Sequence, residues 1–161
     1  MSRGYIHFYD DRNAVPDFAA WERLFEPLGL RLEGFGGRVC AISAEGDQFV
    51  VTREWIVEQV AALREVSFQW WYSDSEDVYC RFNPGERHER WSVELGLDGL
   101  DDGQVDALIA AVRRHFEEQS SRRAACALVV DRNGNCEERD WRPVIDGREG
   151  APCRPEIFLL S

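Results

Sequence analysis

Lysine is absent from this chain of 161 residues, and methionine occurs once. All nineteen basic residues are arginines, so no lysine can serve as a Schiff-base nucleophile, a general base or a P-loop residue. The chain also lacks a G-x-S-x-G turn and any C-x-x-C pair. No apolar run is long enough for a signal peptide or a membrane span, so the sequence predicts a cytoplasmic protein without membrane contact.

The five cysteines are odd in number and lie far apart, which favours free thiols in a reducing compartment. Three of them, Cys40, Cys80 and Cys126, lie in apolar segments where a free cysteine behaves as a small hydrophobic residue. The three histidines have no neighbours at the spacing of a zinc site. We therefore expect neither a metal nor another cofactor, and we expect His7, inside an apolar strand, to be structural.

Thirty acidic residues oppose the nineteen arginines and give a formal net charge of −11. Such a chain repels phosphate backbones, which argues against binding to nucleic acid. It would attract a basic protein and accelerate the encounter with it. Solubility alone is the simpler explanation of the same charge.

The order of the predicted elements indicates an α+β domain spanning residues 1–161. The sheet is expected to be mostly antiparallel, because hairpin-length links join about 8–10 short strands. Three helices are expected at about 16–28, 53–65 and 102–119, the last preceded by the capping-box pair Asp101 and Gln104. The recurring helix-plus-strands unit also hints at an internal duplication. Strands are expected at 5–9, 31–35, 38–43, 48–51, 124–130, 136–141 and 157–160, with an irregular segment at 143–154.

The clearest sheet signal is a meander of three strands within residues 67–96. Alternation places nine apolar side chains on one face of this meander: Phe68, Trp70, Tyr72, Val78, Cys80, Phe82, Trp91, Val93 and Leu95. The opposite face then carries Gln69, Trp71, Tyr79, Arg81, Ser92 and Glu94. Tryptophan, tyrosine and arginine are the residue types that dominate binding hot spots. Acidic residues of the neighbouring turn, Asp74, Glu76 and Asp77, would suit a basic partner surface.

The alternative is that another part of the chain covers this second face. Trp71 would then be buried under the segment after Trp141, or under Trp141 itself. The sequence leaves both alternatives open. Which of them is correct decides whether Trp71, Tyr79, Arg81 and the acidic turn form a binding surface.

In its acidic charge, its lack of catalytic motifs and its hot-spot face, the chain resembles bacterial immunity proteins, the small antidotes to secreted toxins. That resemblance implies a non-catalytic inhibitor that binds a protein partner, for example a basic toxin domain. A small-ligand-binding protein or an enzyme is the first alternative, and a pocket holding a cysteine with two or more of the three histidines, His7, His88 and His115, would favour it. A self-associating structural domain is the second, so the sequence leaves a monomer and a homodimer open.

Overall fold

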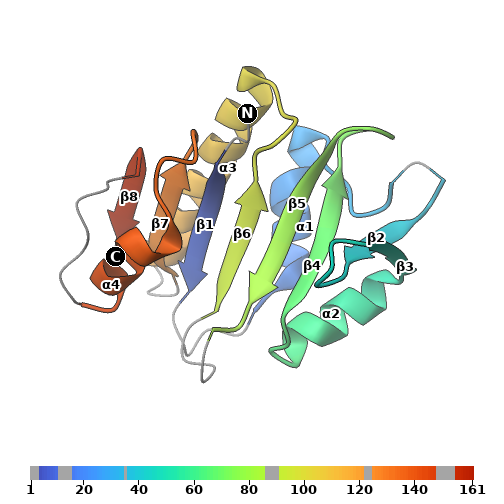
Figure 1. Cartoon of the computed structure of the whole chain (residues 1–161), viewed down its shortest axis with the longest axis horizontal. Helices are drawn as coiled ribbons and strands as arrows, with labels where there is room; N and C mark the ends of the chain where they lie inside the picture. Colours follow the sequence, from blue (N-terminus) through green and yellow to red (C-terminus); the bar gives the residue numbers. More distant parts are fainter. Residues whose placement is uncertain (1–3, 11–15, 35, 86–90, 122–124, 148–154) are drawn as a thin grey trace.

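Eight antiparallel strands form one sheet in the computed structural model, which describes residues 4–10, 16–34, 36–85, 91–121, 125–147 and 155–161 (Figure 1). Their order across the sheet is β3-β2-β4-β5-β6-β1-β7-β8, and every neighbouring pair is antiparallel. The predicted α+β class with an antiparallel sheet is therefore confirmed. The strands are β1 (Tyr5–Asp10), β2 (Val39–Ile42), β3 (Gln48–Val51), β4 (Val66–Trp71), β5 (Asp77–Asn83), β6 (Ser92–Gly96), β7 (Ala125–Asp131) and β8 (Ile157–Leu160).

Three helices cover one face of the sheet and enclose the main core. They are α1 (Phe18–Phe25), which continues into a short 3-10 turn (Glu26–Leu28), α2 (Arg53–Ala61) and α3 (Asp102–Ser121). In Figure 1, α1 and α3 lie behind the strands. Alternate residues of β4, β5 and β6 point into this core, as the meander pattern predicts, and the largest of them is Trp70, 2 % exposed.

Each of the three helices begins at a side-chain cap that the sequence supplies. Asp17 accepts a hydrogen bond from the amide of Ala20, and Thr52 accepts one from the amide of Trp55. Asp101 and Gln104 form the predicted capping box, with reciprocal distances of 2.8 and 3.0 Å. These caps satisfy amides that have no partner inside the helix. Helices α2 and α3 start where the sequence predicts, whereas α1 starts at Phe18 instead of at about residue 16.

A fourth helix, α4 (Glu138–Ile145), replaces the strand expected at 136–141. The carboxylate of Asp131 accepts hydrogen bonds from the amides of Asn135 and Cys136, at 3.0 and 2.7 Å, and so turns the chain away from a hairpin. A capping box between Glu137 and Asp140 then starts the helix. Pro143 lies inside this helix, so residues 143–145 are helical instead of irregular, and residues 148–154 lie outside the described part.

The strand expected at 31–35 is reduced to a single bridge between Arg31 and Trp71. The chain turns immediately afterwards, where the amide of Gly34 donates to the carbonyl of Arg38 at 2.8 Å. Gly36 and Gly37 both have positive φ, which only glycine adopts without strain. A turn built on these glycines leaves too little extended chain for a strand.

Candidate functional site

The sheet has a second face, opposite α1, α2 and α3, which we call the outer face. Helix α4 covers only one end of it, over β1, β7 and β8, where Trp141 packs with Tyr9, Ala127 and Val129 in a small separate core (Figure 1). No helix among the described residues covers β4, β5 and β6 on this side. We call the outward side chains of these strands, together with Tyr5 and His7 of β1, the open face.

Strand register arranges the middle of the open face in two cross-strand rows. The first row is Tyr79, Gly96 and Tyr5 on β5, β6 and β1. Tyr5 pairs with Gly96 in the register of β1 and β6, and Tyr79 precedes Cys80, which pairs with Leu95. A Cβ placed on Gly96 would lie 3.3 Å from the Cβ of Tyr79 and 3.6 Å from the Cε1 of Tyr5, so the two side chains flank this glycine.

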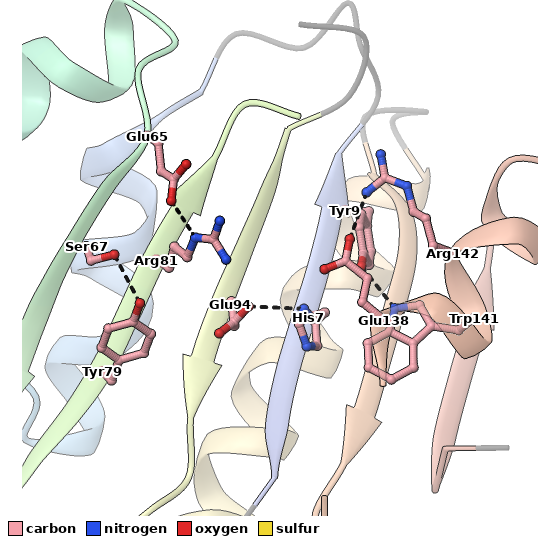
Figure 2. Close-up of polar contacts among 10 residues, drawn as sticks. All are labelled: His7, Tyr9, Glu65, Ser67, Tyr79, Arg81, Glu94, Glu138, Trp141 and Arg142. Carbon is pink, nitrogen blue, oxygen red and sulfur yellow. Dashed lines mark hydrogen bonds and ion pairs between the residues drawn. The ribbon is translucent and has the colours of Figure 1, made fainter. Parts of the chain in front are cut away.

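The second row is Arg81, Glu94 and His7, two residues further along the same three strands. Figure 2 shows Arg81 turned toward Glu65, whose Oε1 lies 2.9 Å from the Nε of Arg81. Glu94 points instead toward His7, with 3.8 Å between Oε2 and Nδ1. That distance exceeds hydrogen-bonding range, so Glu94 accepts no hydrogen bond from the described residues.

His7 is the most deeply buried member of this row, at 5 % exposure. The ring of Trp141 packs against its imidazole with 4.9 Å between ring centroids. Burial, with a smaller contribution from the positive charge of Arg81, lowers the pKa of His7 from 6.5 to about 4. His7 is therefore neutral at physiological pH, and neither ring nitrogen makes a hydrogen bond within the described part of the chain.

Glu94 lies in a position that disfavours a negative charge on its carboxylate. Burial raises the pKa of Glu94, and the carboxylates of Glu138 and Glu65 raise it further, while Arg81 opposes them. Because His7 is neutral and Arg81 is bonded to Glu65, the charge of Glu94 has no partner of its own among the described residues. An ionised carboxylate without hydrogen bonds is costly to bury, and clustered perturbed groups of this kind mark functional sites.

The residues singled out in the sequence separate into two groups. Tyr79 and Arg81 lie on the open face, where the Tyr79 hydroxyl is 3.0 Å from the Oγ of Ser67. Asp77 lies further along the same strand and accepts a hydrogen bond of 2.8 Å from Gln69. Asp74 and Glu76 lie in the turn beyond the strand end, and Glu76 accepts a hydrogen bond from Gln104 at the start of α3.

Trp71 is half-buried, and within the described part of the chain neither predicted cover lies over it. Strand β8 is paired at the far edge of the sheet, and Trp141 packs against His7. The segment 31–34 covers Trp71 instead: Arg31 bridges to its backbone, and Gly34 is close enough that a Cβ there would touch the indole at 3.4 Å. An indented surface of about 400 Å³ adjoins it, between Arg38, Cys40 and Asp74. Trp71 therefore holds the segment 31–34 in place, which is a structural reason for its presence apart from any contact with a partner.

The strand alternation places Glu94 on the outward face of the meander, but the predicted site residues include neither Glu94 nor Tyr5. The signal was present, because alternation in the first strand puts Tyr5, His7 and Tyr9 on one face. What the sequence could not show is that β1 pairs with β6. That pairing brings His7 beside Glu94.

The described residues do not supply the pocket that would favour an enzyme. His115 packs on the opposite side of the sheet against Phe8 and Trp21, and His88 lies outside the described residues. Within the described ranges, no group of three histidine, cysteine or acidic residues could hold a metal ion.

The expectation of free thiols is confirmed for Cys40 and Cys80 and is wrong for Cys136. Cys136 is disulfide-bonded, and the side chains of Cys126 and Cys153 lie outside the described part. Disulfides are rare in reducing compartments, so the cysteines no longer support a cytoplasmic location.

No protein-family model, curated protein or solved structure matches this chain. In the part of the chain that the structure describes, none of the helices has the length and apolar character needed to cross a membrane.

Proposed function

We propose that this protein is a non-catalytic protein-binding module, an inhibitor that binds a basic partner through the open face. The proposal rests on one observation above all. The central strands β4, β5 and β6 present Tyr79, Arg81 and Glu94 on a side that no described helix covers. Tyrosine and arginine on a rigid sheet are typical of hot spots, because little side-chain freedom is lost when they bind.

The charge of the chain supports a basic partner. The net charge of −11 would accelerate association with a positively charged protein. A bacterial immunity protein that neutralises a toxin domain has this character, and we propose that role. A cytoplasmic location is part of the same proposal, and the disulfide bond of Cys136 is the observation that stands against it.

The proposal is tested by recovering the tagged protein, with anything bound, from cells of the organism that encodes it. Three forms are compared: wild type, Tyr79→Ala on the open face, and Arg113→Ala as a control on the exposed side of α3. We expect wild type and the control to retain one basic protein at 1:1 stoichiometry, and Tyr79→Ala to lose it. The purified partner should also lose its own activity when the wild-type protein is added.

A partner retained equally by all three forms would place binding elsewhere on the molecule. Loss from Tyr79→Ala counts only if that variant remains folded, which its far-ultraviolet circular dichroism and its unfolding midpoint establish. Trp71→Ala is not used, because the contact of Trp71 with the segment 31–34 makes loss of binding and loss of folding inseparable.

A self-associating domain is the second candidate, and one observation favours it. Strand β3 lies at a sheet edge and exposes 41 % of Phe49 and 62 % of Val50. Exposed apolar edge strands readily pair with another chain. Sedimentation equilibrium decides between a species of 18.6 kDa and one of twice that mass.

A further inference from the structure

We propose that Glu94, His7, Tyr5 and Tyr79 form a receptor for one arginine side chain of the partner protein. This inference rests on the proposed function and names the group that the open face recognises. Four features of the described residues support it: a carboxylate without a hydrogen bond, a nearly buried imidazole without a hydrogen bond, two neighbouring tyrosines, and the sign of the surrounding charge.

The first feature is the carboxylate of Glu94, which lies in the middle of the open face with 18 % of its side chain exposed. The guanidinium of Arg81, whose charge acts on Glu94, is hydrogen-bonded to Glu65 at 2.9 Å. A carboxylate has about four acceptor positions, and no hydrogen bond from the described residues fills any of them. A cationic donor arriving from outside would supply both the missing charge and the missing hydrogen bonds.

The second feature is His7, which supports the site without relying on any acidic group. Only 5 % of this residue is exposed, yet neither ring nitrogen makes a hydrogen bond within the described residues. The Nδ1 atom faces Glu94 across 3.8 Å. A neutral imidazole has one acceptor nitrogen, so Glu94 and His7 together can accept from two N–H groups of one ligand.

The third feature is the pair of tyrosines beside this row. Tyr5 is 40 % exposed, and it flanks Gly96 together with Tyr79. Aromatic faces attract a guanidinium that stacks on them, and arginine does so more often than lysine. The planar fork of arginine also matches two separate acceptors, whereas an ammonium acts as a point charge.

The fourth feature is the sign of the field at this site. The carboxylates of Glu65 and Glu138 act on Glu94, and those of Glu94 and Asp98 act on Tyr5, so acidic groups lie around Glu94 and Tyr5. Among the described residues, Arg81 is the one cation that acts on Glu94, and it also hydrogen-bonds to Glu65. An anionic ligand is therefore disfavoured, and a metal ion would find fewer than three ligands in the described residues.

The test uses methylguanidinium chloride as the probe for an arginine side chain and methylammonium chloride as the probe for lysine. The carboxyl carbon of Glu94 and the ring nitrogens of His7 are followed by NMR during titration of the whole protein. We expect saturable shifts at both residues with methylguanidinium, several-fold weaker binding of methylammonium, and a lower pKa of Glu94 in the presence of methylguanidinium.

Two variants assign the response to this site. Glu94→Gln keeps the shape of the side chain and removes its charge, so the saturable shift at His7 should disappear. Glu117→Gln, on the exposed side of α3, is the matched control and should respond as wild type does. Shifts that stay linear, that persist in Glu94→Gln, or that are equal for the two probes would overturn the inference. The pKa readout needs no variant and stands even if Glu94→Gln folds poorly.

The same variants separate this inference from the proposed function. With the purified partner, Glu94→Gln should weaken binding by about 30-fold or more, the effect of removing one member of a buried charge pair. If Tyr79→Ala releases the partner and Glu94→Gln does not, the arginine receptor is wrong and the open face still binds. If methylguanidinium binds and Tyr79→Ala retains the partner, the proposed function is wrong instead.

Discussion

Replacing His7 by phenylalanine should remove a specific part of the acid sensitivity of this protein. His7 has a pKa of about 4 in the folded protein, compared with 6.5 for an ordinary histidine. Between these two values the unfolded chain binds the proton and the folded protein does not. The free energy of unfolding therefore falls as the pH is lowered through this window. Phenylalanine keeps a ring against Trp141 and cannot be protonated.

The magnitude follows from the two pKa values. The full lowering corresponds to roughly 3 kcal/mol once the pH is below the folded pKa. Between about pH 7.5 and about pH 5 the His7 contribution is about 2 kcal/mol, from the proton binding of the two states. His7 is almost completely buried, so solvent screening does not reduce this value appreciably.

The assay is urea unfolding at these two pH values, followed by tryptophan fluorescence, for wild type and His7→Phe. Wild type should lose about 2 kcal/mol more than the variant between about pH 7.5 and about pH 5. Burial also lowers the pKa of His115, but that residue is present in both proteins and cancels. An equal loss in the two proteins would refute the claim that His7 is held neutral.

Glu94 changes the free energy of unfolding in the opposite direction as the pH falls. A second pair of proteins separates its contribution from that of His7. Its pKa is raised in the folded state, so protonation as the pH falls toward 4.5 removes the cost of the buried charge. Repeating the comparison in a Glu94→Gln background should preserve the difference due to His7. A difference that vanishes there would mean that His7 and Glu94 titrate as one coupled pair.

Three further predictions concern the fold around the open face. Trp141→Ala should lower the free energy of unfolding by about 3–5 kcal/mol, because it empties the small core under α4 and removes the hydrogen bond to Tyr9. Chemical denaturation measures this loss, and a loss below about 1 kcal/mol would contradict the packing of Trp141. Asp101→Ala should cost about 1 kcal/mol by removing the cap of α3, measured in the same way, and no change would mean that the cap does not stabilise the helix. Burial raises the pKa of Cys80 to about 12, so a thiol reagent at neutral pH should modify the half-buried Cys40 much faster than Cys80, as peptide mass mapping will show.

Local patterns were sufficient for most of the sheet. Alternation identified β4, β5 and β6, because one face of each is apolar and the other is not. Capping residues located α3, since an aspartate and a glutamine at this spacing satisfy amides at a helix start. Both signals act over a few residues, which is the range that a sequence shows directly.

The failures have long-range or competing causes. The strand expected at 136–141 became α4 because the carboxylate of Asp131 holds the amides of Asn135 and Cys136. The dipeptide Asn133-Gly134 between them is typical of a hairpin turn and does not reveal this capture. The pairing of β1 with β6 joins His7 and Glu94 across most of the first hundred residues. No local pattern encodes that contact, so the centre of the open face had to come from the fold.

The most direct test of the open face is hydroxyl-radical footprinting of the protein with and without its purified partner. Oxidation of Tyr5 and Tyr79 should fall several-fold in the complex, because both rings would lie under the partner. Leu160, 51 % exposed on the edge strand β8, should be oxidised at the same rate in both samples. Unchanged oxidation of both tyrosines, with protection elsewhere on the molecule, would contradict the account.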